Sequence, residues 1–158
     1  MEDTNLLKNM GRILAEEFSR NHRLVLLVAD SMNSSKTNLI KENFPDRFFQ
    51  MGISEQDMVG AAIGLSHEGF IPIITAYTAY LIPRAYEQLR NHIGIDNQNI
   101  KLIATHAGFT GYNPGDRSYE DIALAKTIDH LTLMSPHSSN ELDFCIKFMI
   151  KAKGGSYL

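Results

Sequence analysis

The segment Gly52-Ile53-Ser54-Glu55-Gln56 places a carboxylate where a short strand gives way to a helix. Spacing alone favours helix capping, with Ser54 as the N-cap and Glu55 near the positive end of the helix dipole. The other interpretation is a functional carboxyl group, buried and directed across the edge of a sheet. Both interpretations stay open on the residues alone, and the segment is the first candidate for acid–base chemistry.

Two further groups of side chains that could bind a ligand or take part in a reaction lie at strand ends. His106 follows an apolar strand and precedes Gly108 and Gly111, which let a backbone approach a ligand closely. Tyr77 and Tyr80 are three residues apart where a strand passes into a helix. A lone histidine at a strand end is more often structural, and aromatic residues at this spacing usually belong to a core. At the carboxyl end of a strand, however, two such rings also suit the stacking of a flat ligand ring.

Apolar runs alternate along the chain with segments of helical periodicity, which predicts the elements that position these groups. The predicted strands are 24–29, 47–50, 71–75, 101–105 and 131–134, with one more at 156–158, and the predicted helices are about 5–20, 57–67, 80–92, 119–126 and 140–151. This order is typical of the α/β class, with an open, mostly parallel sheet and helices on both faces. Ligands of such sheets bind at the carboxyl ends of the strands, here after Ala29, Gln50, Thr75 and Thr105.

The composition narrows the classes of function. Hydrophobic residues make up 44% of the 158 residues and the net charge is -3, so we expect neither a nucleic acid nor a membrane partner. The single cysteine, Cys145, excludes an internal disulfide and a cysteine-cluster zinc site, and its apolar neighbours predict that it is buried. No phosphate-binding loop, dinucleotide fingerprint or nucleophile elbow occurs, and the histidines lack metal-ligand spacing. We expect a cytoplasmic protein that holds no metal in this chain.

From about residue 8 to residue 158 the sequence resembles the transketolase family of thiamine-diphosphate-dependent enzymes. The resemblance implies the thiamine diphosphate-binding fold, with residues 1–158 forming one pyrimidine-binding domain. Its most specific part is the segment around Glu55, and the other parts follow in the family's order. The matching blocks are Gly52 to Gln56, Val59 to Leu65, Gly69 to Pro72, Arg84 to Arg90, Thr105 to Gly108 and Glu120 to Leu124.

The resemblance also implies roles for particular residues. Glu55 would be the catalytic glutamate that shares a proton with a ring nitrogen of the cofactor. Tyr77 and Tyr80 would flank the aminopyrimidine ring, and Asp30, in the pair Ala29-Asp30, would lie beside the cofactor. His106 and Ser34 match family positions near the sugar substrate. The expected activity is ketol transfer between sugars.

Other family features are missing or altered. No Gly-Asp-Gly motif for the diphosphate and Mg²⁺ occurs, so we expect a partner chain or domain to supply it, in a homo-oligomer or hetero-oligomer. This absence fits a fragment or a split-gene subunit. The loop 111–118 lacks a histidine that the family usually carries, Ser135 stands where an arginine often precedes proline, and only Lys8 and Arg12 lie near another expected arginine. The alternatives are therefore a deoxyxylulose-phosphate synthase, a 2-oxo-acid dehydrogenase β subunit, or a non-catalytic assembly module.

Overall fold

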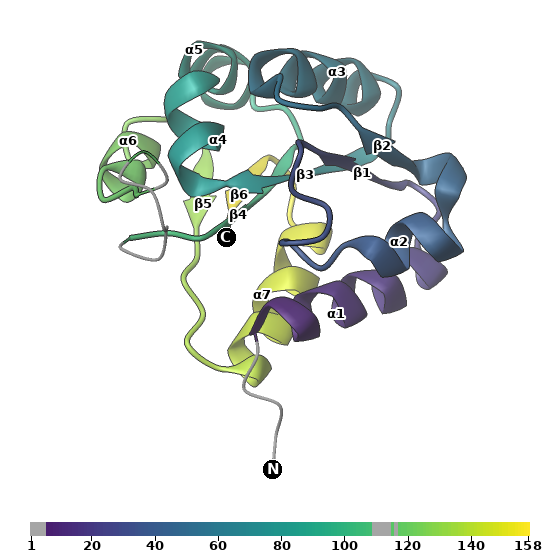
Figure 1. Cartoon of the computed structure of the whole chain (residues 1–158). Helices are drawn as coiled ribbons and strands as arrows, with labels where there is room; N and C mark the ends of the chain where they lie inside the picture. Colours follow the sequence, from purple (N-terminus) through teal and green to yellow (C-terminus); the bar gives the residue numbers. More distant parts are fainter. Residues whose placement is uncertain (1–5, 109–114, 116) are drawn as a thin grey trace.

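The computed structural model describes residues 6–108, 115 and 117–158, which fold around one parallel sheet (Figure 1). Within these residues the sheet has six strands in the order β2-β1-β3-β4-β6-β5, and every neighbouring pair is parallel. The strands are β1 (Leu24–Val28), β2 (Phe48–Gln50), β3 (Ile71–Tyr77), β4 (Lys101–Thr105), β5 (Leu131–Leu133) and β6 (Gly155–Tyr157). The predicted α/β class is confirmed, and the sheet is parallel throughout rather than mostly so.

Helices cover both faces of the sheet because the central strands are apolar on both sides. In β1, Val25 and Leu27 belong to one hydrophobic cluster, whereas Leu24, Leu26 and Val28 belong to the other. Figure 1 shows α3, α4 and α5 over one face and α1, α2 and α7 over the opposite face. The α-helices are α1 (Leu6–Arg20), α2 (Asn38–Asn43), α3 (Glu55–His67), α4 (Thr78–Arg84), α5 (Tyr86–Leu89), α6 (Asp121–Ala125) and α7 (Ser139–Lys151). The other helical segments are the 3₁₀-helix η1 (Pro45–Arg47) and the π-helix η2 (Arg90–Ile95).

Three local features differ from the sequence-based predictions. The helix α2 was not predicted, because it has six residues of which only Ile40 is buried, too few to show a helical period. The helix predicted over residues 80–92 is instead divided into α4, α5 and η2, with a break at Ala85. Cys145 is half-buried rather than buried. None of the helices in the described residues has the length and apolar character needed to cross a lipid bilayer.

Close packing fixes how α1 sits on the loop that follows β1. A Cβ atom added to Gly11 would overlap the backbone carbonyl oxygen of Lys36. Only glycine permits this approach, so α1 can lie directly against the loop that carries Ser34 and Ser35. The close approach holds this loop at the carboxyl edge of β1.

Candidate functional site

The predicted site residues follow four neighbouring strands and therefore meet at one edge of the sheet. Glu55 begins α3, shortly after β2, and Tyr77 ends β3. Asp30 lies just after β1, and His106 directly follows β4. Because all of these strands are parallel, their carboxyl ends lie at the same edge of the sheet. Residues up to about half the chain length apart in the sequence are therefore brought together there.

The carboxylate of Glu55 is buried and engaged in an ion pair. Its side chain is 4% exposed, and Nη1 of Arg84 lies 3.2 Å from Oε1 and 3.0 Å from Oε2. Ser54 occupies the N-cap position, but its hydroxyl donates to the carbonyl oxygen of Met51 at 2.8 Å instead of capping α3. The structure therefore does not contain the predicted Ser54 cap, and Glu55 is a buried carboxylate paired across two elements.

Arg84 holds this pair in place from the end of α4. Its guanidinium lies over the ring of Tyr80, with Cζ 3.9 Å from the ring centroid, and its backbone carbonyl accepts a hydrogen bond from Nε2 of Gln56 at 2.8 Å. The sequence analysis assigned no role to Arg84. The only signal was its place in the family-like block from Arg84 to Arg90, because the contact with Glu55 spans 29 positions.

The aromatic side chains form a row along the same edge. The rings of Tyr77 and Tyr80 are nearly parallel, with an interplanar angle of 16° and centroids 6.3 Å apart. The centroid of Tyr77 also lies 4.2 Å from that of His106, whose backbone has a positive φ of 60°. Both tyrosines are half-buried rather than part of the core. The row thus runs from His106 through Tyr77 and Tyr80 to Arg84 and Glu55.

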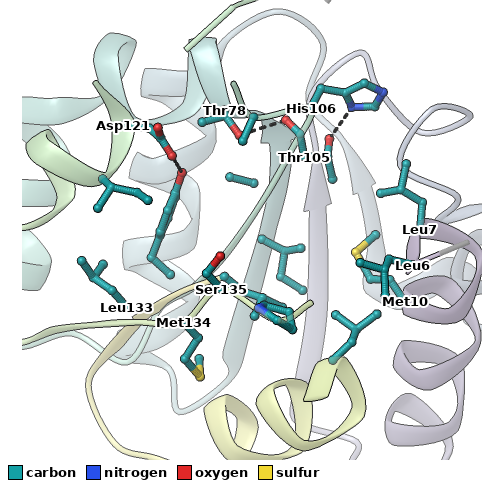
Figure 2. A pocket seen from close by; sticks show the side chains of 18 of the residues that line it. Leu6, Leu7, Met10, Thr78, Thr105, His106, Asp121, Leu133, Met134 and Ser135 are labelled. Atoms are coloured by element: carbon teal, nitrogen blue, oxygen red, sulfur yellow. Dashed lines mark hydrogen bonds between the residues drawn. The ribbon is translucent and has the colours of Figure 1, made fainter. Parts of the chain in front are cut away.

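Two hollows adjoin this row. One, of about 460 Å³, lies beside the carboxylate and is lined by Ile53, Ser54, Glu55, Gln56, Asp57 and Arg84. The other, of about 570 Å³, lies at the ends of β4, β5 and β6. Figure 2 shows its polar rim, formed by Thr78, Thr105, His106 and Asp121, with apolar walls that include Met10 and Met134. Both volumes are in the range of small-molecule sites.

A buried tyrosine supports the polar rim of the larger hollow. The hydroxyl of Tyr157 donates to Oδ2 of Asp121 at 2.9 Å. Burial, together with the nearby Asp121 carboxylate, raises the pKa of Tyr157 well above its usual range. Tyr157 therefore stays protonated at physiological pH and remains a hydrogen-bond donor to Asp121.

Asp30 and Ser34 are placed at the predicted edge but not in the row. Asp30 is exposed after β1, and the Ser34 hydroxyl donates to the carbonyl oxygen of Ser31 at 3.0 Å within its own loop. Most of the altered loop 111–118 lies outside the described residues. Among the described residues, no three His, Cys, Asp or Glu side chains gather in a way that would hold a metal ion.

A parallel α/β domain with a buried carboxylate and stacked rings at its carboxyl edge is a ligand-binding domain of the open-sheet class. The family described as "Transketolase, pyrimidine binding domain" matches residues 3–158. The chain therefore belongs to the transketolase family, as a pyrimidine-binding domain. This assignment confirms the resemblance drawn from the sequence.

The chain is also similar in sequence to three proteins described as transketolases or as a related synthase. The chain is 33% identical over 153 residues to a "Putative transketolase C-terminal section" of Methanocaldococcus jannaschii, covering 96% of this chain and 48% of that protein. It is 30% identical over 158 residues to one subunit of the apulose-4-phosphate transketolase of Actinobacillus succinogenes, covering 96% of this chain and 50% of that protein. It is 32% identical over 133 residues to the 1-deoxy-D-xylulose-5-phosphate synthase of Syntrophus aciditrophicus, covering 84% of this chain and 20% of that protein. The chain thus spans half or less of these relatives.

Solved structures support the fold. A structure titled "Split gene transketolase, inactive beta4 tetramer" matches with a TM-score of 0.85 and 33% identity, over 96% of this chain and 49% of that one. The transketolase of Campylobacter jejuni matches with a TM-score of 0.89 and 18% identity, over 99% of this chain and 25% of that one. At that identity the second match supports the fold alone.

Proposed function

We propose that residues 1–158 form the pyrimidine-binding unit of a thiamine-diphosphate-dependent, transketolase-type enzyme that transfers ketol groups between sugars. The observation that carries this proposal is the buried Glu55 carboxylate, which lies beside a hollow at the carboxyl edge and pairs with Arg84, whose guanidinium lies over the ring of Tyr80. A buried carboxylate is costly to keep in a fold. Its position beside a ligand-sized hollow favours a functional group over a helix cap.

The residues fit the pyrimidine half of the cofactor. Glu55 supplies a carboxylate that can hold a proton at a ring nitrogen, and the two half-buried tyrosines supply flat faces for stacking. We place Asp30 beside the cofactor, and His106 and Ser34 toward the sugar. Thiamine diphosphate supplies a carbon nucleophile that adds to a ketone and stores the electron pair of the broken carbon–carbon bond.

The diphosphate and its Mg²⁺ would be held by a partner chain or domain. Two carboxylates, Glu55 and Asp57, line the hollow beside the predicted ring site, which opposes the approach of a diphosphate. The names of the relatives as a section and as a subunit support an assembly from more than one chain. We therefore propose an assembly with a partner chain. The small residues along α3, such as Gly60 and Gly64, suit close packing against another subunit and favour at least two copies of this chain, and light scattering of the reconstituted complex would test that number.

A synthase of the deoxyxylulose-phosphate type is the second candidate, because the Syntrophus aciditrophicus enzyme is 32% identical over 133 residues. The two activities differ in what they release. Transfer of a two-carbon unit between sugars leaves no gas, whereas a synthase that uses a 2-oxo acid releases CO₂. Supplying the reconstituted complex with ketose phosphates and, separately, with 2-oxo acids would distinguish them.

The role of Glu55 can be tested with Glu55→Gln in the reconstituted complex. The amide keeps the shape of the side chain and still accepts from Arg84, but it cannot exchange a proton with a ring nitrogen. We expect turnover to fall by at least about a hundredfold and stability to change by only about 1 kcal/mol, because the amide oxygen still accepts from Arg84. Glu68→Gln is the matched control, because Glu68 is exposed at the other end of α3. Near-normal turnover of Glu55→Gln would refute the proposed function.

Cofactor binding gives a second measurement. We expect calorimetry to show that the chain alone binds thiamine diphosphate with Mg²⁺ weakly or not at all, whereas the complex binds it. Micromolar binding by the chain alone would contradict the partner-supplied diphosphate site.

A further inference from the structure

Arg84 is built into the site in a way that the proposed function leaves unexplained. A single nitrogen, Nη1, contacts both carboxylate oxygens of Glu55, and the same guanidinium is stacked on Tyr80. Resting on the proposed function, we propose that Arg84 is a positioning residue, which fixes the plane and balances the charge of the Glu55 carboxylate beside the proposed site of the cofactor ring.

The geometry explains how one side chain does this. The terminal torsion of a glutamate is broad and leaves the carboxylate free to rotate. A donor nitrogen 3.2 Å and 3.0 Å from the two oxygens lies close to the midline between them, which restricts that rotation. The donor is itself restrained, since the ring of Tyr80 supports the flat face of the guanidinium.

The charges around the hollow make Arg84 the compensating group. Among the six residues that line the hollow, Glu55 and Asp57 are acidic and Arg84 is the only basic one. Asp57 is exposed to solvent, whereas Glu55 is 4% exposed and depends on its partner for compensation. Removal of the guanidinium would therefore leave a buried carboxylate unpaired and free to turn.

A purely structural ion pair between α3 and α4 is the alternative, and the chain offers a way to separate the two roles. The side chain of Gln56 already links the start of α3 to the backbone carbonyl of Arg84 at 2.8 Å. Any substitution of Arg84 keeps that carbonyl. Arg84→Met also keeps an unbranched aliphatic side chain at this position, so it removes the contact with Glu55 and spares the link between the helices.

The first test measures urea unfolding of the chain alone. Wild type, Arg84→Met, Glu55→Gln and the double variant form a double-mutant cycle. We expect Arg84→Met to lower the unfolding midpoint when Glu55 is present, and to change it little in the Glu55→Gln background, because no buried charge then remains unpaired. An equal decrease in both backgrounds would show that Arg84 does not act through Glu55, and would overturn the proposal. Arg20→Met is the control, because Arg20 ends α1 and its side chain is 65% exposed.

The second test uses the complex and thiamine diphosphate with Mg²⁺, without any sugar. Exchange of the proton on the reacting carbon of the bound cofactor is followed by NMR, beside the Kd of the cofactor. We expect Arg84→Met to slow exchange by about tenfold or more, since a displaced acid–base group loses alignment, with little change in Kd. Arg84→Lys should recover part of the rate, because it restores the charge without the flat guanidinium that stacks on Tyr80.

The outcomes separate this inference from the proposed function. If Glu55→Gln slows exchange and Arg84→Met does not, Arg84 has no positioning role and the function of Glu55 stands. If neither variant slows exchange, the proposed function fails. If Arg84→Met proves unstable, the comparison of wild type with Arg84→Lys decides the matter, and equal exchange rates would refute the proposal.

Discussion

Lys101 gives the sharpest prediction for the stability of the fold. It is the first residue of β4 and is fully buried, and its Nζ donates to the carbonyl oxygens of Ala152 at 2.9 Å and Gly154 at 2.7 Å. It thereby joins the end of α7 and the approach to β6 to the middle of the sheet. Burial lowers the pKa of Lys101 from its usual 10.5 to about 8. A neutral amine still has two N–H groups, one for each carbonyl, so deprotonation costs no hydrogen bond.

The direction of the pH dependence follows from this shift. A pKa of about 8 in the folded state and 10.5 in the unfolded state means that the unfolded chain binds more protons between these values. The contribution of Lys101 to stability is therefore fully present above pH 10.5 and is lost as the pH falls through about 8. Between pH 7 and pH 9.5 the free energy of unfolding should rise by about 2 kcal/mol from this group alone.

The measurement is urea unfolding of wild type and Lys101→Met at several pH values from 7 to 9.5. Contributions of other titrating groups are shared by both proteins and cancel in the difference. We expect Lys101→Met to be less stable at every pH, because two buried carbonyls lose their donor at about 1–3 kcal/mol each. The deficit should widen by about 2 kcal/mol toward pH 9.5. Lys41→Met, which changes an exposed lysine of α2, should show no such widening. A deficit that stays constant with pH would refute the argument.

Two glycines give opposite predictions for the same substitution. Gly11→Ala should lower the free energy of unfolding by about 1–3 kcal/mol, because its Cβ would overlap the carbonyl oxygen of Lys36, and thermal unfolding would measure the loss. Gly64→Ala should raise it by about 0.5–1 kcal/mol in the chain alone, because Gly64 is exposed in α3 with nothing within 4 Å of an added Cβ. If α3 packs closely against another subunit, Gly64→Ala should also weaken assembly in sedimentation experiments, and unchanged assembly would count against that packing.

The sheet could be predicted from the sequence because its strands are continuous apolar runs. The run from Leu24 to Val28 is buried at every position, as expected for a strand that is covered on both faces. The parallel order then predicted that Glu55, Tyr77 and His106 would meet at one edge, and they do. Prediction failed where local pattern carries little information, as in the six residues of α2.

The ion pair of the site could not be predicted for a different reason. Arg84 reaches Glu55 only because α4 ends beside the start of α3, and that placement depends on the packing of both helices on the sheet. Helical periodicity predicted one helix over residues 80–92, which would have continued past Arg84. The break at Ala85 ends α4 at Arg84, with its side chain across the hollow.

The charge arrangement at the carboxyl edge bears on how a complete site would be assembled. In this chain the guanidinium of Arg84 is paired with the Glu55 carboxylate, which is 4% exposed, and Asp57 adds a second negative charge to the same hollow. A diphosphate brought to this edge would meet two carboxylates, and the exposed Asp57 has no compensating contact in the hollow, so its charge repels an anion, though water screens that repulsion. A neutral aromatic ring meets no such barrier. The edge is therefore suited to the ring half of the proposed cofactor, and the positive charge that a diphosphate needs would have to come with the partner.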